Sequence, residues 1–343
     1  MLQTTPLGRN SGLIVSRLCL GTMNFGEPGR GHQGDWTLGL DDARPLFKAA
    51  IEKGIFYFDC ADIYGIGASE TVVGALLREL LPREDYVLAT KISMPMGPNP
   101  NAGGLSRKHI MEGVDACLRR LGVDYLDKLV IHRHPHGIAG HQTTPIEETL
   151  EALHDVVKAG KVTYLGASSM FAWQFAELQL TAKINGWTPF VSMQNHYNLV
   201  YREEEREMLP YCEKTGVAVT PWSPLARGIL AGAYQGGFSG GSTARSQGRD
   251  RQRTQSLYQG DAVFDIAARV IETADKYGKT PAQIALAWLL SKPVVTAPIV
   301  GVSRVEQLDQ LIAATEIHLE PEDVGYLEEL YQPVQNLLSI GSS

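Results

Sequence analysis

Short apolar runs alternate with longer amphipathic stretches along this chain. The apolar runs are rich in Val, Ile and Leu, and they cover residues 18–22, 56–59, 86–91, 127–132, 162–167, 191–194, 217–221 and 294–300. The amphipathic stretches cover residues 41–53, 69–80, 106–121, 146–159, 171–184, 203–215, 262–290 and 304–314. Apolar strands that alternate with helices indicate a parallel sheet buried on both faces. Because no linker composition separates these units, they predict an α/β fold, a closed (β/α)₈ TIM barrel that forms one domain over residues 1–343.

The remaining segments predict a hairpin and two long loops. Residues 3–17 place a Gly/Asn/Ser-rich turn between two short runs, and we expect a β-hairpin that caps the bottom of the barrel. Residues 24–40 and 227–260 are long loops, which we expect at the C-terminal face, and loops of this length are usually functional or disordered. The second loop carries four arginines that are surface charge by default and also candidates for phosphate binding: Arg245, Arg249, Arg251 and Arg253.

Composition and charge argue against several classes of function. The net charge is −7, and no basic stripe offers a footprint for nucleic acid. No window reaches the ~18 uninterrupted apolar residues of a membrane span, and residues 1–10 lack the pattern of a signal peptide. The cysteines contain no close pair, so we expect a reducing, cytoplasmic location rather than a disulfide framework or a zinc knuckle. The sequence leaves a homo-oligomer open.

Polar side chains stand at the ends of three successive predicted strands. Asp59 ends the second strand and leads to Tyr64, Lys91 ends the third, and His132 ends the fourth. In a parallel barrel the C-terminal strand ends surround the active site, so these four side chains are expected at one mouth. Each is expensive to bury unless it is paired, which makes a chance cluster there improbable.

This set of residues suits the reduction of a carbonyl group. A carbonyl oxygen that accepts a hydride on its carbon must receive a proton, which Tyr64 can donate. We expect Lys91 to lower the pKa of Tyr64 from its reference value of ~10, Asp59 to keep Lys91 charged, and His132 to orient the carbonyl. Taken singly, each residue is more often structural. The four together favour catalysis.

Several motifs resemble those of the aldo-keto reductase superfamily, and the resemblance covers nearly the whole chain. The matching stretches are residues 20–23 (LGTM), 58–65 (FDCADIYG), 89–91 (ATK), 131–133 (IHR), 166–169 (GASS), 194–198 (QNHYN), 222–228 (WSPLARG) and 301–308 (GVSRVEQL). The chain resembles most a bacterial branch that includes a reductase-like protein proposed to make 1-deoxyxylulose 5-phosphate. The resemblance implies that Asp59, Tyr64, Lys91 and His132 form the catalytic tetrad, and that NADP(H) is the cofactor.

The resemblance also implies a set of cofactor-binding residues. Ser168, Ser169 and Gln194 would contact the nicotinamide carboxamide, and Trp222 would stack on the nicotinamide ring. Ser223, Leu225 and Gly228 would contact the pyrophosphate. Ser303, Arg304 and Gln307 would hold the adenosine 2′-phosphate, which favours NADPH over NADH. The remaining members of the set are Gly21, Thr22, Met23, Asp59, Pro224 and Gly301. Independently of the resemblance, Ser303 stands at a predicted helix N-terminus beside a basic residue, which is typical of an anion site and also of a simple N-cap.

These observations give one leading hypothesis and several alternatives. We expect NADPH-dependent reduction of a small aldehyde or ketone (or alcohol oxidation in reverse), with residues from Arg133 to His141 bordering the substrate. Candidate pocket residues are Met23, Phe25, Trp36, Met94 and His134. A sugar-phosphate rearrangement would use the same acid–base groups with Arg133, Arg227 and the loop arginines as phosphate ligands.

Three further alternatives have less support. The spacing His132-x-His134-x-His136 allows a metal-dependent hydrolase, but the sequence indicates no further ligands on other strands, and we expect no metal. Residues 65–70 only approach a dinucleotide-binding glycine motif, because the last position is Glu70. A non-catalytic cofactor-binding module is disfavoured by the intact tetrad.

Overall fold

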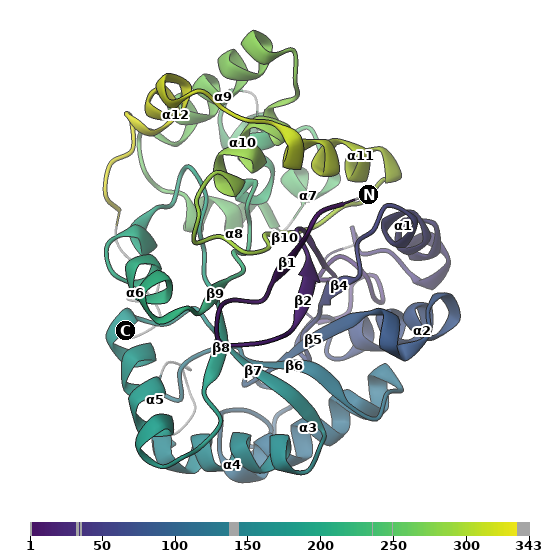
Figure 1. Cartoon of the computed structure of the whole chain (residues 1–343). Helices are drawn as coiled ribbons and strands as arrows, with labels where there is room; N and C mark the ends of the chain where they lie inside the picture. Colours follow the sequence, from purple (N-terminus) through teal and green to yellow (C-terminus); the bar gives the residue numbers. More distant parts are fainter. Residues whose placement is uncertain are drawn as a thin grey trace.

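Eight parallel strands form the central sheet of the protein, which we describe from a computed structural model over residues 2–31, 34, 36–136, 144–234, 236–248 and 250–334 (Figure 1). The spatial order is β10-β3-β4-β5-β6-β7-β8-β9. The strands are β3 (Cys19–Gly21), β4 (Tyr57–Asp59), β5 (Val87–Ile92), β6 (Leu126–Ile131), β7 (Val162–Ser168), β8 (Phe190–Gln194), β9 (Ala218–Val219) and β10 (Ile299–Val300).

The two edges of this sheet meet and close the barrel. Val219 at the end of β9 forms a parallel bridge with Val295, and the Thr296 amide donates to the Val219 carbonyl at 2.8 Å. One step further, the Ile299 amide donates to the Pro221 carbonyl at 2.9 Å. The predicted (β/α)₈ barrel is therefore confirmed, and a doubly wound open sheet is excluded.

A β-hairpin covers the N-terminal ends of the barrel strands. It consists of β1 (Thr4–Pro6) and β2 (Ile14–Ser16), paired antiparallel, and it lies in front of the barrel in Figure 1. Leu7 and Val15 are fully buried there against a small cluster of residues from the barrel interior that includes Cys19 and Tyr57. The predicted hairpin is confirmed, and it leaves the opposite end of the barrel for the functional residues.

Helices surround the sheet in the order predicted from the amphipathic stretches. They are α1 (Leu40–Glu52), α2 (Ala68–Leu80), α3 (Arg107–Leu121), α4 (Ile146–Lys158), α5 (Ala172–Ile184), α6 (Met208–Thr215) and α11 (Val305–Ala313). The α3 helix illustrates the local rules. Its N-cap Ser106 accepts from the His109 amide, and Gly122 ends it in the left-handed conformation. Ile110, Val114 and Leu121 lie on its buried face.

Two predicted elements differ from the structure near the C-terminal end of the barrel sequence, and one helix there was not predicted. The helical region predicted over 262–290 consists of two helices, because Gly278 in a left-handed conformation (φ 63°) and Pro281 divide it into α9 (Val263–Tyr277) and α10 (Pro281–Leu290). Within the predicted strand 294–300 only Ile299 and Val300 form β10, since Pro298 has no amide hydrogen for a ladder bond. The helix α12 (Pro321–Glu328) is absent from the prediction.

The predicted loop over 227–260 contains regular structure. A tight turn with 3₁₀ hydrogen bonds, Ala226–Ala231, opens it, in which Arg227 and Gly228 have non-helical backbone angles. Two short helices follow, α7 (Ala244–Gln247) and α8 (Asp250–Leu257). Arg249 and the side chain of Arg245 lie outside the described residues. The segment is thus a folded excursion in the part that the structure describes.

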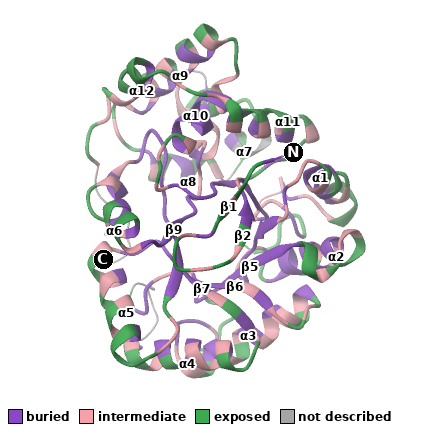
Figure 2. Cartoon of the chain, in the orientation of Figure 1, coloured by how far each residue is buried: buried purple, intermediate pink, exposed green. Residues whose placement is uncertain are grey.

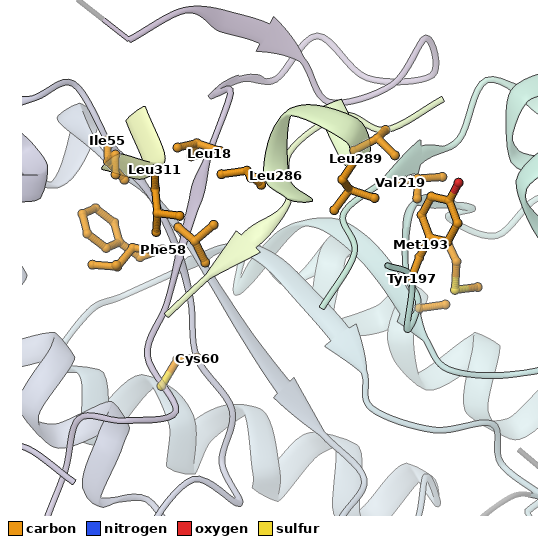
Figure 3. Packing of buried hydrophobic residues seen from close by; sticks show 14 of the residues in the cluster. Leu18, Ile55, Phe58, Cys60, Met193, Tyr197, Val219, Leu286, Leu289 and Leu311 are labelled. Atoms are coloured by element: carbon orange, nitrogen blue, oxygen red, sulfur yellow. The ribbon is translucent and has the colours of Figure 1, made fainter. Parts of the chain in front are cut away.

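The main hydrophobic core lies between the sheet and the helices (Figure 3). Phe58 of β4 stacks on Phe47 of α1 with ring centroids 5.5 Å apart, and Leu18 and Leu311 belong to the same core. Figure 2 shows the strands buried and the outer faces of the helices exposed. Because neighbouring residues on a strand point to opposite faces, the residues between these outward-facing ones point into the barrel.

Two further findings concern the described helices and the cysteines. No described helix combines the length and the apolar character that crossing a membrane requires. Four cysteines, Cys19, Cys60, Cys117 and Cys212, are buried as free thiols.

Candidate active site

Strand alternation and register bring three of the predicted catalytic residues to one mouth of the barrel. Asp59 of β4 lies in register with Ala89, and two residues further along β5 stands Lys91, in register with Val130 of β6. His132 follows two residues after Val130, and its amide donates to the Ile92 carbonyl at 2.9 Å. From each strand to the next, the functional residue thus lies two residues, or one inward-facing position, further towards the C-terminal end of the strand.

Lys91 is the centre of the hydrogen-bond network at this mouth. Its Nζ donates to Asp59 Oδ2 at 2.5 Å, to the Cys60 carbonyl at 2.7 Å and to the Tyr64 hydroxyl at 3.2 Å. The side chain of Lys91 is fully buried, and that of Asp59 is 2% exposed. Three bonds use the full donor capacity of an ammonium group, so its position is fixed.

Tyr64 and His132 complete the cluster. Tyr64 lies in the turn between β4 and α2, where the Tyr64 amide donates to the Ala61 carbonyl at 3.1 Å. Its ring meets the His132 ring edge-on, with centroids 6.2 Å apart. The structure therefore brings together all four residues that the sequence singled out, on the end of the barrel opposite the hairpin.

Burial and charge shift the pKa values of these groups. Burial disfavours the Lys91 ammonium, but Asp59 and Tyr64 outweigh it and raise the pKa of Lys91. Burial lowers the pKa of His132 well below its usual range, and the charges of Arg133, Lys91 and Arg253 add to this, so the imidazole is neutral. Burial also raises the pKa of Tyr64, and Lys91 opposes this only in part. The expectation that the pKa of Tyr64 lies below its reference value is therefore wrong for this structure.

A second buried cluster, which the sequence interpretation missed, contacts the backbone of Lys91 and the side chain of its neighbour Thr90. Thr90 Oγ1 donates to Glu70 Oε1 at 2.6 Å, and Arg120 Nε of α3 donates to Glu70 Oε2 at 2.6 Å. The Asp62 amide donates to the Lys91 carbonyl, and burial raises the pKa of the Asp62 carboxyl. The only signal in the sequence was an acidic residue at the first turn of a helix, which is common at helix N-termini.

Trp222 lies in an aromatic stack beyond the end of β9. Its ring is 4.1 Å from that of His196 at an interplanar angle of 9°, and His196 stacks in turn on Tyr201 at 4.4 Å. Trp222 Nε1 donates to Ser169 Oγ at 3.0 Å. His196 Nε2 lies 2.8 Å from the Tyr258 hydroxyl, just after α8. The stack, which sequence reasoning also missed, thus links Trp222 to the 227–260 excursion.

The backbone around Trp222 is strained. Four residues near it in sequence or by contact have positive φ without being glycine: Ser169 (49°), Ser223 (53°), Ala226 (47°) and Arg227 (55°). Each such conformation costs about 1–2 kcal/mol and concentrates at functional sites. The strain is consistent with a segment shaped for a ligand rather than for packing alone.

Other predicted cofactor-binding residues have partners within the protein. Gln194 Nε2 donates to Asp59 Oδ1 at 2.9 Å, which makes Gln194 a neighbour of the tetrad. Ser168 Oγ donates to the Gln194 carbonyl at 2.9 Å. Gly21 is required by packing, because a Cβ there would lie 2.6 Å from Ile299 Cγ2. Thr22 is buried, and its Oγ1 donates to the Asp59 carbonyl at 3.0 Å.

The third predicted group lies at the start of α11. Gln307 Oε1 accepts from the amides of Ser303 at 2.8 Å and Arg304 at 3.1 Å, so Gln307 caps the helix. Ser303 and Arg304 are exposed. Nearby, Asn24 Nδ2 after β3 donates to the Val302 carbonyl, which ties this segment to the barrel mouth.

The remaining members of the predicted sets occupy mixed positions. Gly301 is exposed, Pro224 is buried, and Leu225, Gly228 and Met23 are half-buried. An exposed basic residue at a helix N-terminus, an indole on a strained segment and hydroxyls beside it are groups that could hold a nucleotide with a flat ring at one end and phosphates along it.

The predicted pocket residues divide into two kinds. Trp36 and Met94 are half-buried. Phe25 is fully buried and packs against Phe47 with centroids 5.1 Å apart, so it belongs to the core and does not line an open pocket. His134 is 2% exposed and meets His136 edge-on. Residues 137–143, which include His141, lie outside the described residues.

The three histidines suggested for a metal do not converge. His134 and His136 contact each other, whereas His132 contacts Tyr64. Within the described part of the chain, no group of three or more His, Cys, Asp or Glu side chains has the arrangement of a metal site.

Comparison with known proteins gives a consistent result. The model of the aldo/keto reductase family matches residues 17–332. A putative aryl-alcohol dehydrogenase of Schizosaccharomyces pombe is 43% identical over 351 residues, with 95% of each chain covered. The versiconal hemiacetal acetate reductase of Aspergillus parasiticus is 42% identical over 342 residues, covering 94% of this chain and 96% of the relative.

A putative aryl-alcohol dehydrogenase of Saccharomyces cerevisiae is 36% identical over 352 residues, covering 94% of this chain and 96% of the relative. These relatives are fungal, so the expected affinity with a bacterial branch is not supported, and the rearrangement hypothesis that depended on it loses its basis. The match to the family model and the relatives agree: the chain belongs to the aldo/keto reductase family and is an oxidoreductase.

Proposed function

We propose that this oxidoreductase reduces a small aldehyde or ketone with NADPH, or oxidises the alcohol in the reverse direction, with Tyr64 as the proton donor. The observation that carries the proposal is the contact of the Lys91 ammonium with Asp59 at 2.5 Å and with the Tyr64 hydroxyl at 3.2 Å. The names of the relatives, an aryl-alcohol dehydrogenase and a hemiacetal acetate reductase, agree with chemistry at a carbonyl or alcohol carbon.

Each residue of the proposed tetrad has a separate role in this reaction. Bound NADPH supplies the hydride, and the chain supplies the proton and the site. Tyr64 donates its hydroxyl proton to the substrate oxygen, and Lys91 stabilises the phenolate that remains. The neutral imidazole of His132 can donate a hydrogen bond to the same oxygen and orient it. Asp59 keeps Lys91 charged and fixes its direction.

The cofactor is proposed to lie across the mouth from Trp222 to α11. The indole of Trp222 would contact the nicotinamide, with Ser168, Ser169 and Gln194 near the carboxamide. Ser223, Leu225 and Gly228 would accompany the pyrophosphate. Ser303, Arg304 and Gln307 would hold the adenosine 2′-phosphate at the helix N-terminus, which is the basis for preferring NADPH over NADH.

The test is Tyr64→Phe, which removes the hydroxyl group and with it both the transferable proton and the acceptor of the Lys91 hydrogen bond. We expect kcat for aldehyde reduction to fall by about 10²–10⁴-fold, while the Kd for NADPH stays within about twofold of wild type. The matched control is Tyr164→Phe on β7, a tyrosine that packs against the small cluster between the hairpin and the barrel interior. Turnover is followed by the absorbance of the reduced nicotinamide over a panel of aldehydes and ketones. Near-wild-type kcat in Tyr64→Phe would remove the assignment.

A further inference from the structure

The three most exposed large apolar residues in the described part of the chain lie on one helix. Trp173, Leu180 and Ile184 belong to α5, and they are 60%, 58% and 74% exposed, respectively. The exposed Glu177 lies between them. At 3.6 residues per turn these four positions fall within about 60° around the helix axis. They form a single stripe along the helix, which we call the α5 stripe.

The α5 stripe faces away from the barrel. The buried side of the helix consists of Phe175, Leu178 and Ala182. The helix lies on the outside of the barrel between α4 and α6 (Figure 1), and its outer side is exposed (Figure 2). Single exposed apolar residues are ordinary on a protein surface. Three that are aligned on one helix face indicate a surface that contacts another molecule.

The charges on this helix are placed symmetrically about Leu180. Glu177 precedes Leu180 by three residues and Lys183 follows it by three, and both charged residues are exposed. Neither has an ion-pair partner in the part of the chain that the structure describes. When two copies of α5 pack antiparallel with Leu180 opposite Leu180, each Glu177 lies at the height of Lys183 of the second copy. Ile184 then lies at the height of Ala176, whose small side chain leaves room for it.

This symmetry favours a second copy of the chain over other occupants. A two-fold interface must be self-complementary, because the same surface supplies both sides. A lipid surface fits less well, since helices that bind membranes carry Lys and Arg on their polar face. Here Glu177 lies among the apolar residues of the stripe, and the whole chain has a net charge of −7.

We propose that the α5 stripe is the interface of a symmetric homodimer, in which two α5 helices pack antiparallel about a two-fold axis at Leu180. The inference is independent of the proposed function. The 13 residues of α5 span about 20 Å, so this contact is smaller than the ~800 Å² per partner of a standard interface. We therefore expect a weak dimer with a Kd on the order of 10–100 µM.

The first test is sedimentation velocity of the full chain over about 1–300 µM, a range that spans the expected Kd. Leu180→Lys places two like charges at the two-fold axis and should raise the dimer Kd about 10-fold or more. The matched control is Ile14→Lys, which adds the same charge at an apolar residue of β2 that is 47% exposed. The control should keep the wild-type Kd. Circular dichroism of both variants checks that the fold is retained.

Charge reversal tests the antiparallel arrangement. Glu177→Lys and Lys183→Glu each place like charges opposite each other twice per dimer, so each should raise the Kd about 3–10-fold. The double variant with both substitutions restores opposite charges at both places and should return the Kd to within about twofold of wild type. A nonspecific effect of net charge does not give this recovery, because the double variant and wild type have the same net charge.

A cross-link tests the position of the two-fold axis. The four cysteines of the chain are buried, so Leu180→Cys adds one accessible thiol. Helix axes ~8–10 Å apart bring the two symmetric Cα atoms to about 4–6 Å, a separation that a disulfide can bridge. With diamide as the oxidant, we expect a covalent dimer of Leu180→Cys on a non-reducing gel, and little from the control Ile14→Cys.

Three results overturn the inference. The first is a monomer at every concentration, which would leave the stripe to a different protein or to residues 335–343, which lie outside the described residues. The second is a dimer whose Kd Leu180→Lys does not change, since its interface would lie elsewhere. The third is a double charge-reversal variant that dimerises no better than the single variants, which would exclude the antiparallel pairing of Glu177 with Lys183.

Discussion

The stability of the buried Lys91–Asp59 pair can be tested by Asp59→Asn. The substitution keeps the shape of the side chain and an oxygen that can accept from Gln194, but it removes the negative charge that Lys91 faces at 2.5 Å. Both side chains are at most 2% exposed, so water does not replace the lost partner. The variant therefore measures the cost of a buried ammonium without a counter-charge.

The magnitude follows from the distance and the burial. Two unit charges 2.5 Å apart attract each other by about 7 kcal/mol at an effective dielectric constant of ~20, before the cost of desolvation is subtracted. Removing one partner of a buried pair typically costs about 3–5 kcal/mol. Lys91 keeps its bonds to the Cys60 carbonyl and the Tyr64 hydroxyl, so we expect the lower end, about 3 kcal/mol at pH 7.

The dependence on pH has a definite sign. In wild type the pKa of Lys91 is raised on folding, so its contribution is complete below the unfolded pKa of ~10.4 and is lost only as the pH rises through the folded value. Without Asp59, burial dominates and lowers the folded pKa. The unfolded chain then binds more protons, and the free energy of unfolding of the variant should rise between pH 7 and pH 9.

Urea unfolding at pH 7 and pH 9 provides the assay. The double variant Asp59→Asn with Lys91→Met should regain part of the loss because no buried charge remains. As a surface control, Asp309→Asn removes the partner of the half-exposed Lys53 and should cost less than about 1 kcal/mol. The reasoning fails if Asp59→Asn costs no more than Asp309→Asn, or if its stability does not rise with pH.

Two further predictions concern the proposed cofactor site. Arg304→Ala should raise the Kd for NADPH about 10-fold and leave that for NADH unchanged, because only NADPH carries the 2′-phosphate, and equal effects in a fluorescence titration would contradict this role. Tyr258→Phe removes the hydroxyl beside His196 Nε2 and Asn198 Nδ2, so it should lower the free energy of unfolding by about 1 kcal/mol and weaken NADPH binding several-fold. Unchanged NADPH affinity in that variant would mean that the aromatic stack does not position Trp222.

Much of the barrel and the proposed tetrad could be predicted because both follow from short-range patterns. Strand alternation decides which residues face inward, and parallel strands deliver their C-terminal ends to one mouth. Asp59, Lys91 and His132 are therefore neighbours because each faces inward at the C-terminal end of its own strand, and the pattern of each strand shows this by itself. The hairpin was predictable for a similar reason, since its turn residues lie between its two strands.

Contacts between distant segments were beyond such reasoning. Glu70 is paired with Arg120, fifty positions away on another helix, and no local pattern distinguishes this glutamate from any other in the first turn of a helix. Phe25 lies in a loop and therefore suggested a pocket, but the loop folds it onto Phe47. The excursion over 227–260 looked like a loop because its composition is polar. Its described helices are held by specific polar contacts, such as that of Arg227 with Asp250, and not by an apolar face that a sequence pattern would reveal.

The raised pKa of Tyr64 changes what Lys91 has to do in the proposed reaction. Burial keeps the phenol protonated throughout the neutral range, so the donor is always loaded when substrate arrives. A carbonyl oxygen that has gained a hydride on its carbon is a far stronger base than phenolate, and transfer therefore proceeds without prior acidification. The free-energy cost arises after the transfer, because the Tyr64 phenolate that remains is buried away from water. Lys91, held at 3.2 Å by its bond to Asp59, offsets that cost where the charge develops. The couple is thus better understood as stabilising the product of proton transfer than as acidifying the resting donor.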